Sequence, residues 1–284
     1  MNPEVYELRP GRTPLLISMP HVGRAIPEDQ RERYVERALG SEDTDWHLEG
    51  LYAPIAEALG AGLLIPRYSR YLIDLNRPPE DTPMYPGASN TELCPTRFFT
   101  GEPLYKEGRA PDAQEKQRRL QTYWYPYHQA LQGELQRLRQ QHGQALLFEA
   151  HSIRSQLPWL FEGQLPDLNL GTVDGQSCRK VTREAMNIVL NAQQDFSWVL
   201  DGRFKGGYIT RQYGRPALGQ QVVQMEMCYR CYMVENELGY TGYELDEACM
   251  ARIRPVLKLL LEAYLMANPS RLANPSRSAG APAA

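Results

Sequence analysis

Short apolar runs alternate along this chain with segments of helical periodicity, and this alternation limits the possible folds more than any other feature. Residues 15–19 form a short apolar run that Pro20 closes, which is typical of a buried strand, and residues 145–150 form another. Residues 45–59 carry apolar side chains at helical spacing, and Gly60 stands where a C-terminal cap belongs. The alternation predicts a three-layer α/β/α fold with a mixed, largely parallel central sheet.

The remaining elements are predicted from the same two patterns. The Gln- and Arg-rich face of the longest expected helix is predicted to be solvated. We expect further strands at residues 62–65, 71–75, 207–210 and 220–227, and further helices at residues 113–141, 177–192 and 246–267.

The length of 284 residues suits one large domain, which we place at residues 1–267. Residues 78–111 are rich in Pro, Gly, Thr and Asn and form a long excursion, and such loops are usually functional. Residues 268–284 repeat the string ANPSR and hold little apolar surface, so a disordered tail is predicted there.

Composition excludes several classes of protein. The 31 basic and 34 acidic side chains give a net charge of −3, which argues against a nucleic-acid-binding surface. No apolar run approaches the roughly 20 residues of a membrane-spanning helix. Five scattered cysteines and an N-terminus without a signal-like apolar core favour the reducing cytoplasm. We therefore expect a soluble cytoplasmic protein that binds neither nucleic acid nor membrane, and the sequence leaves its oligomeric state open.

Two of the five histidines, His21 and His151, directly follow predicted strands. Because open α/β sheets place their sites at the carboxyl ends of strands, these imidazoles are candidate metal ligands rather than two separate structural histidines. Two imidazoles and one carboxylate leave an open position on zinc for a water molecule, although Mn, Fe or Co would also suit them. Asp43 and Asp45 are the candidate acidic ligands. We choose Asp45, which Trp46 would hold in place, and expect the other aspartate to cap the helix.

Glu226 lies in an otherwise apolar predicted strand, where a carboxylate is costly unless it is used or paired. It is the candidate general base and acid, and the alternative is an exposed carboxylate on an edge strand. Arg70, Arg77, Arg203 and Arg211 surround the same predicted edge of the sheet, and guanidinium groups bind carboxylates in pairs of hydrogen bonds. The cluster predicts an anionic substrate.

Five strings of the sequence, LLISMPHVG, DTDWH, SRYLIDLNRP, EAHSIRS and RFKGGYITRQYG, together resemble the N-formylglutamate amidohydrolase family. The likeness runs from about residue 15 to residue 232. The fold of that family is similar to that of the zinc carboxypeptidases, of the phosphorylase/hydrolase-like type, and of the aspartoacylase and succinylglutamate desuccinylase group. The resemblance implies hydrolysis of N-formyl-L-glutamate to formate and L-glutamate, a late step of histidine degradation, and makes residues 1–267 a catalytic domain.

The resemblance also implies roles for individual residues at the metal. It gives His21 and His151 as ligands of one divalent ion, most simply zinc, together with an aspartate of the DTDW run. In the wider relatives a ligand glutamate follows the first histidine by three positions, where this chain has Arg24. The strand glutamate matched to the general base is Glu226, which would deprotonate a metal-bound water and return the proton to the departing amine.

For the substrate, the resemblance implies that Arg70 polarises the scissile carbonyl and that Asn76 and Arg77 hold one carboxylate. Arg203 or Arg211 is then available for the second carboxylate. Two other functions remain possible at this point. One is hydrolysis of another N-acyl amino acid, as in the desuccinylase and aspartoacylase enzymes, and the other is a non-catalytic module that binds acidic amino acids.

Overall fold

The computed structural model describes residues 5–83, 91–235 and 242–269 and is built on one mixed sheet in the order β1-β3-β2-β4-β7-β5-β6. β3, β2, β4 and β7 run parallel to one another, whereas β1 and β5 are antiparallel to their neighbours β3 and β7, and β6 is parallel to β5. The strands are β1 (Tyr6–Arg9), β2 (Leu15–Ser18), β3 (Gly62–Pro66), β4 (Ala145–Ile153), β5 (Leu168–Gly171), β6 (Trp198–Leu200) and β7 (Gln220–Cys228).

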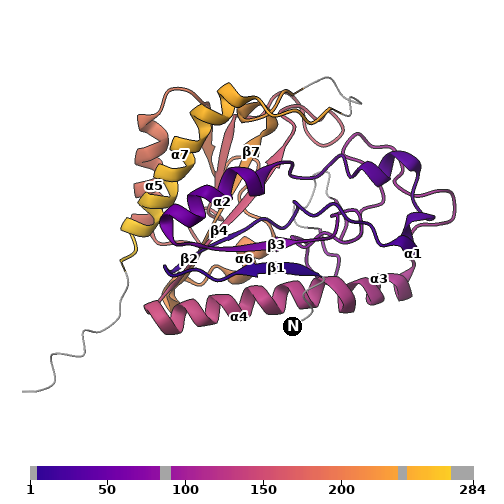
Figure 1. Ribbon diagram of the computed structural model, residues 1–284, viewed down its shortest axis with the longest axis horizontal. Helices are drawn as coiled ribbons and strands as arrows, with labels where there is room; N and C mark the ends of the chain where they lie inside the picture. The colour runs from indigo at the N-terminus through magenta and orange to yellow at the C-terminus, as the bar shows by residue number, and fades with distance from the viewer. Residues whose placement is uncertain (1–4, 84–90, 236–241, 270–284) are drawn as a thin grey trace, which may run out of the picture.

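Helices cover both faces of this sheet (Figure 1). One layer holds α2, α5 and α7, and the opposite face is crossed by the long rod of α3 and α4, with α6 on the same side. The helices are α1 (Glu28–Arg31), α2 (Leu48–Leu59), α3 (Ala113–Arg119), α4 (Tyr125–His142), α5 (Lys180–Ala192), α6 (Tyr208–Tyr213) and α7 (Glu247–Met266). The predicted α/β/α architecture with a mixed sheet is confirmed.

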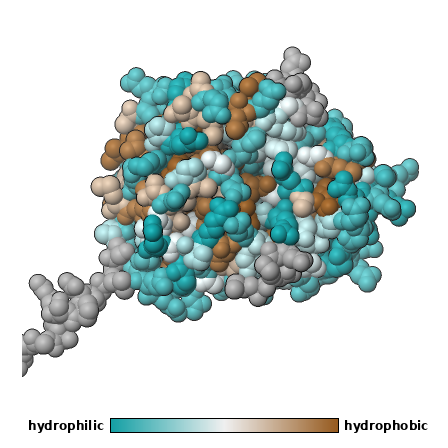
Figure 2. All heavy atoms as spheres, in the orientation of Figure 1, coloured by the Kyte–Doolittle hydropathy of each residue, from teal (hydrophilic) through white to brown (hydrophobic). Residues whose placement is uncertain are grey.

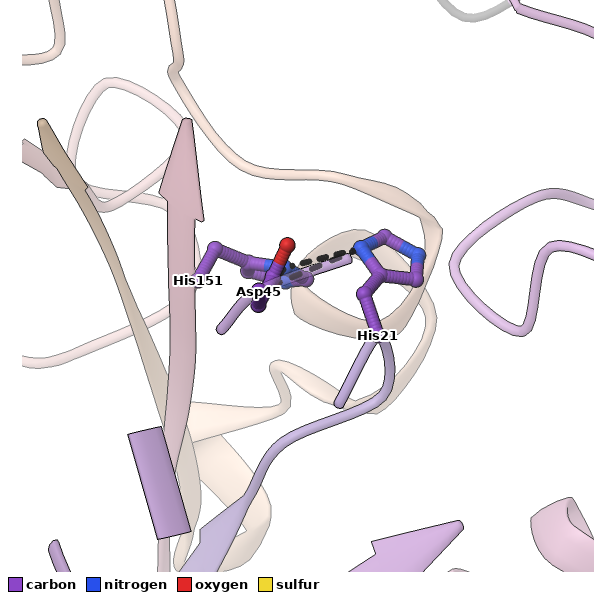
Figure 3. Close-up of side chains that lie close together, drawn as sticks. All are labelled: His21, Asp45 and His151. Carbon is purple, nitrogen blue, oxygen red and sulfur yellow. Dashed lines mark hydrogen bonds and ion pairs between the residues drawn. The ribbon is translucent and has the colours of Figure 1, made fainter. Parts of the chain in front are cut away.

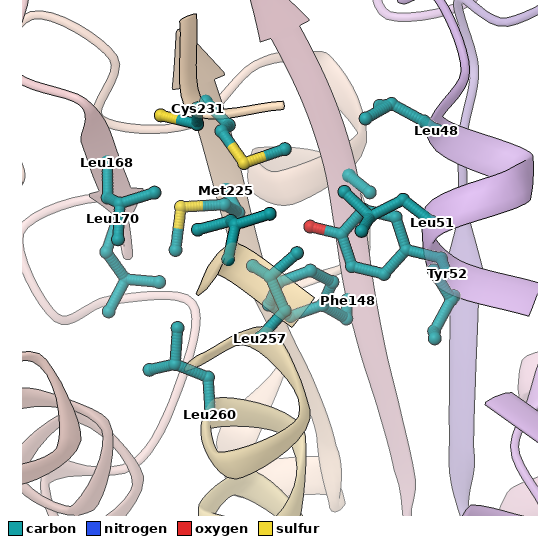
Figure 4. Close-up of a cluster of buried hydrophobic side chains, with 14 of the residues drawn as sticks. Leu48, Leu51, Tyr52, Phe148, Leu168, Leu170, Met225, Cys231, Leu257 and Leu260 are labelled. Atoms are coloured by element: carbon teal, nitrogen blue, oxygen red, sulfur yellow. The ribbon is translucent and has the colours of Figure 1, made fainter. Parts of the chain in front are cut away.

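Alternate residues of the central strands point to opposite layers, as the pleat of a strand requires. Ile17, Phe148 and Met225 pack with α2, α5 and α7 in one core, part of which is shown in Figure 4. Leu16 and Leu147 face the other way, toward α4. Because both faces are buried, the central strands read as continuous apolar runs, which is why they could be located in the sequence.

Most predicted elements are present, with shifts of a few residues at their ends. The helix expected at residues 45–59 begins at Leu48, and Gly60 caps it in the left-handed conformation with φ of 63°. The helix expected at 113–141 is continuous through a π-helical turn at Leu120–Trp124, which joins α3 to α4. Asp246 caps α7 through a hydrogen bond from the amide of Cys249.

Two predicted strands were wrong. Residues 71–75 are buried but irregular, because their backbone groups bond to scattered partners rather than to a neighbouring strand: the carbonyl of Tyr71 accepts from the Tyr34 hydroxyl at 3.0 Å, and the amide of Asp74 donates to the carbonyl of Leu93 at 2.7 Å. Residues 207–210 begin α6, where the amide of Ile209 donates to Oδ1 of Asn76 at 2.9 Å. In both places a tertiary hydrogen bond replaces the ladder of a sheet.

The Gln- and Arg-rich face of the long helix is solvated as predicted at Gln121, Gln132 and Gln136, but Arg119 departs from that prediction. Arg119 is fully buried, and its guanidinium donates to Glu115 at 2.8 Å, to the carbonyl of Leu72 at 2.8 Å and to the hydroxyl of Tyr105 at 2.9 Å. It also donates to Gln30 at 3.0 Å. This one side chain therefore ties the long helix to the excursion at residues 78–111 and to the irregular segment that leads to Asn76.

The outer surface mixes polar and apolar side chains, and Figure 2 shows hydrophobic patches scattered among hydrophilic ones on one face. No helix among the described residues is long and apolar enough to cross a membrane. At the C-terminal end Asn268, the first residue of the expected tail, is buried and donates to the carbonyl of Tyr264 at 2.7 Å. The remainder of that tail, residues 270–284, lies outside the described residues.

Replacement of Arg119 by methionine should lower the free energy of unfolding by about 3–5 kcal/mol, because it removes one of the two arginine partners of Glu115 and leaves the buried carbonyl of Leu72 without its donor. The matched change Arg118→Met removes a partly exposed partner of the same glutamate and should cost less than about 1 kcal/mol. Urea denaturation of both variants measures the difference. Equal losses would show that the buried arginine does not anchor the excursion.

Candidate metal centre

Three side chains from distant parts of the chain meet at the carboxyl-end edge of the sheet (Figure 3). His21 lies in the turn after β2, His151 lies near the end of β4, and Asp45 lies in the segment before α2. Nδ1 of His151 is 3.1 Å from Oδ2 of Asp45 and 3.1 Å from Nδ1 of His21, and the latter nitrogen is 3.8 Å from the same carboxylate oxygen. All three residues are buried.

Backbone hydrogen bonding holds the aspartate segment against the histidine turn. The amide of Asp45 donates to the carbonyl of His21 at 3.0 Å. From the other side, the hydroxyl of Tyr229 donates to the carbonyl of Thr44 at 2.6 Å. Hydrogen bonds to the main chain at residues 44 and 45 therefore fix the position of Asp45, in addition to the contacts of its own side chain.

The two candidate aspartates have different surroundings. Oδ2 of Asp43 accepts from the hydroxyl of Tyr71 at 2.7 Å and from the amide of Phe99 at 2.9 Å, and burial raises the pKa of Asp43 to about 6. Oδ1 of Asp45 is buried and has no hydrogen-bond partner among the described residues. The expected helix cap is wrong for both: α2 starts after His47, and within this described segment no side chain caps it.

A second carboxylate stands behind each imidazole. Nε2 of His21 is 2.7 Å from Oδ1 of Asp74, and Nε2 of His151 is 3.0 Å from Oε1 of Glu149. Both carboxylates are fully buried. A carboxylate that accepts from one ring nitrogen turns the other nitrogen toward the centre, which is the usual arrangement around metal-bound histidine.

Neither Asp74 nor Glu149 was given a role from the sequence. The available signal for Glu149 is its spacing, because residues two apart on a strand share one face and Glu149 precedes His151 by two. The signal for Asp74 is weaker, because it lies in the irregular segment of residues 71–75, where a spacing of two carries no information on shared faces.

The donor set fits a divalent metal ion. Nitrogen and oxygen ligand atoms from His21, Asp45 and His151 all lie within 4.8 Å of one another. Burial and Arg70 lower the pKa of His21, which favours the neutral form of the ring that a metal ligand requires. At His151 burial is outweighed by hydrogen bonds to Asp45 and Glu149, which raise its pKa to about 10. The centre therefore attracts positive charge, and Asp45 offers it a buried oxygen that accepts no hydrogen bond from the described residues.

A cavity of about 340 Å³ opens directly onto this centre. Its apolar wall includes Phe99, Leu160, Phe161 and Phe204. The predicted site residues that line the cavity are His21, Arg70, Asn76, Arg77, His151, Arg203 and Glu226.

Arg211 does not line this cavity. Its side chain is exposed, and its Nε donates to the carbonyl of Gly206 at 3.0 Å. Arg203 lies at the cavity with its guanidinium 5.0 Å from the ring centre of Phe161, and it donates to the carbonyl of Leu160 at 2.7 Å. Of these two arginines, the structure thus brings Arg203 to the site.

Glu226 lies on β7, which pairs with β4 on one side and β5 on the other, so it is not on an edge strand. In the parallel register it stands opposite His151. Burial raises the pKa of Glu226 to about 8, against the influence of His151 and Arg70. A buried carboxyl whose pKa lies near neutrality is suited to both accepting and donating a proton.

Arg70 and Arg77 are held in different ways. Arg70 is buried, donates to Oδ2 of Asp74 at 2.9 Å and stands 3.9 Å from Oδ1 of Asp45. Arg77 instead binds the excursion, because it donates to the carbonyl and hydroxyl oxygens of Thr91 at 3.0 and 2.6 Å. Arg70 is therefore directed toward the candidate metal ligands, whereas Arg77 also fixes a wall of the cavity.

Two polar side chains connect the centre to α6. Nδ2 of Asn76 is 3.1 Å from Nε2 of His151, while its Oδ1 receives the α6 amide of Ile209. Gln224, which had no predicted role, lines the cavity and accepts from the amide of Gly207 at 2.7 Å. Its signal in the sequence was again a spacing of two, here before Glu226.

Comparison with known proteins identifies close relatives. A family model described as N-formylglutamate amidohydrolase matches residues 13–233, which include every residue of the centre. A protein from Pseudomonas putida named N-formylglutamate deformylase is 49% identical over 92% of this chain and 96% of its own length. Another of that name from Pseudomonas aeruginosa is 47% identical over 91% and 96%. The crystal structure of an N-formylglutamate amidohydrolase from Ralstonia eutropha matches with a TM-score of 0.76 and 25% identity, over 93% of this chain and 97% of that one.

The two aspartates provide a matched test of the metal centre. We expect Asp45→Asn to weaken zinc binding at least tenfold, because it removes a charged ligand, and Asp43→Asn to retain the affinity of the natural protein. Equilibrium dialysis against buffered zinc, with metal analysis of the retained protein, measures both. Loss of zinc in the Asp43 variant with retention in the Asp45 variant would reverse the assignment.

Proposed function

Because this chain belongs to the N-formylglutamate amidohydrolase family, we propose that it hydrolyses N-formyl-L-glutamate to formate and L-glutamate at the cavity described above. The observation that carries the proposal is that one cavity is lined by the two candidate metal-binding histidines, the buried Glu226 and three arginines. Its metabolic role, a late step of histidine degradation in the cytoplasm, stays a prediction.

The metal ion would be held by His21, Asp45 and His151. When bound, such an ion supplies Lewis-acid polarisation and lowers the pKa of water. Glu226 faces the same space and takes a proton from the attacking water. Oxygen then adds to the formyl carbon, the carbon–nitrogen bond breaks, and Glu226 returns the proton to the departing amine, so that formate and the amino acid leave.

Arg70 is placed to stabilise the oxyanion that develops on the formyl oxygen. Its guanidinium is buried and fixed by Asp74, so it requires little reorganisation as charge develops. The formyl group itself offers few contacts, and recognition must come from the two carboxylates of the substrate. Asn76, Arg77 and Arg203 line the cavity and supply donors for them.

The main alternative function is hydrolysis of a substrate that carries a larger acyl group. The cavity of about 340 Å³ lies at the lower end of the usual range of about 300–1,000 Å³ for ligand pockets, which favours a small substrate. A non-catalytic binding module would have no use for a buried carboxyl such as Glu226 beside the candidate metal ligands.

Turnover of three acyl-glutamates by the zinc-loaded protein distinguishes these functions. We expect N-formyl-L-glutamate to yield formate and glutamate in equal amounts, with a kcat/KM well above that for the N-acetyl and N-succinyl compounds. Faster cleavage of either larger compound would transfer the assignment to the desuccinylase and aspartoacylase type. Tight binding of glutamate without turnover of any compound would favour the binding module.

The change Glu226→Gln should lower kcat by about 10²- to 10⁴-fold, because an amide cannot transfer the proton. Zinc content should stay at the natural level, since Glu226 is not among the candidate ligands. The same chemical change at the exposed Glu162, next to the cavity wall, should leave kcat unchanged. A Glu226 variant with undiminished kcat would remove this residue from the mechanism.

A further inference from the structure

Phe99 forms the part of the cavity wall that lies against Arg70. Cζ of Arg70 is 4.7 Å from the centre of the Phe99 ring, and both residues line the cavity. Arg70 in turn stands 3.9 Å from Oδ1 of Asp45. The ring is therefore separated from the candidate metal ligands by one guanidinium group.

Phe99 is held in this position from behind. Its amide donates at 2.9 Å to Oδ2 of Asp43, which is buried and also receives the hydroxyl of Tyr71 at 2.7 Å. The preceding ring, Phe98, meets Tyr71 edge to face with the ring centres 5.6 Å apart. A hydrogen bond to a buried carboxylate is strong and costly to break, so this part of the excursion is a fixed wall.

The reacting carbonyl has to lie among the candidate metal ligands, Arg70 and Glu226. The acyl carbon of a formamide carries only hydrogen beyond its oxygen and nitrogen, whereas an acetamide carries a methyl group in the same place. A rigid ring on Arg70 restricts the space for that methyl group. It also shields one face of the guanidinium from water, which strengthens the interaction of Arg70 with developing charge.

We propose that Phe99 determines the acyl-group selectivity of this enzyme, because its ring, fixed by Asp43 over Arg70, closes the side of the reacting centre that a larger acyl group would occupy. This inference rests on the proposed function and adds the residue that confines it to formyl compounds. Asp43 is then a positioning residue that acts through Phe99, although it was considered as a metal ligand from the sequence.

The test compares kcat/KM for N-formyl-, N-acetyl- and N-succinyl-L-glutamate in the zinc-loaded natural protein and in Phe99→Ala and Phe99→Leu. We expect the ratio of kcat/KM for the acetyl compound to that for the formyl compound to rise at least tenfold in the alanine variant and by less in the leucine variant. A change of this size is typical of the pocket contacts of one methyl group. The matched control is Phe204→Ala, which removes a cavity ring that lies 5.8 Å from Cζ of Arg203. That change should leave the ratio within threefold of the natural value.

The outcomes separate this inference from the proposed function. A natural protein that does not hydrolyse N-formyl-L-glutamate contradicts the function itself. A natural protein that does so, with an unchanged acetyl-to-formyl ratio in both Phe99 variants, overturns only the role of Phe99. Should the alanine variant fail to fold, the ratio in the leucine variant decides, because Phe→Leu preserves an apolar side chain and the packing behind it.

Discussion

Buried negative charge governs the centre of this molecule. Asp45, Asp74 and Glu149 are almost completely withdrawn from water, which is costly for carboxylates unless positive charge accompanies them. Arg70 supplies one such charge through its hydrogen bond to Asp74. The remaining need for positive charge acts on His151, where hydrogen bonds to carboxylates outweigh the effect of burial and raise the pKa of the imidazole to about 10. A divalent cation would meet the same demand, so metal binding and stability of this edge of the sheet are coupled.

The parallel pairing of β2, β4 and β7 brings these side chains together in one site. Their carboxyl ends lie at one edge, and the register places His151 directly opposite Glu226. Since side chains repeat every two residues along a strand, Glu149 supports His151 from the same face of β4, and Gln224 shares a face of β7 with Glu226. Residues 91–105 of the excursion then add the outer wall, anchored by Arg119 and Asp43 through contacts with the body of the domain.

Much of this arrangement could be predicted from the sequence, and the exceptions share a physical reason. His21 and His151 were found because they follow apolar runs whose length and flanks identify strands. Residues 71–75 and 207–210 also carry suitable patterns, but their backbone groups bond to partners distant in the sequence, which periodicity does not reveal. Arg119 was misplaced for the same reason: a polar side chain reads as solvated unless its buried partners are known.

The residue that follows α7 has a consequence for the order in which the fold can be completed. Asn268 joins the starts of the two central strands to α5, since its Oδ1 receives Nε2 of Gln221 at 2.6 Å, its Nδ2 donates to Thr182 at 2.9 Å and its carbonyl accepts from Gln144. Gln144 and Gln221 are buried at the edge of the sheet opposite the candidate metal centre. Their polar groups acquire these partners only after residue 268 has been synthesised, so this edge of the sheet reaches its final set of hydrogen bonds through a segment that follows every candidate ligand of the centre in the sequence.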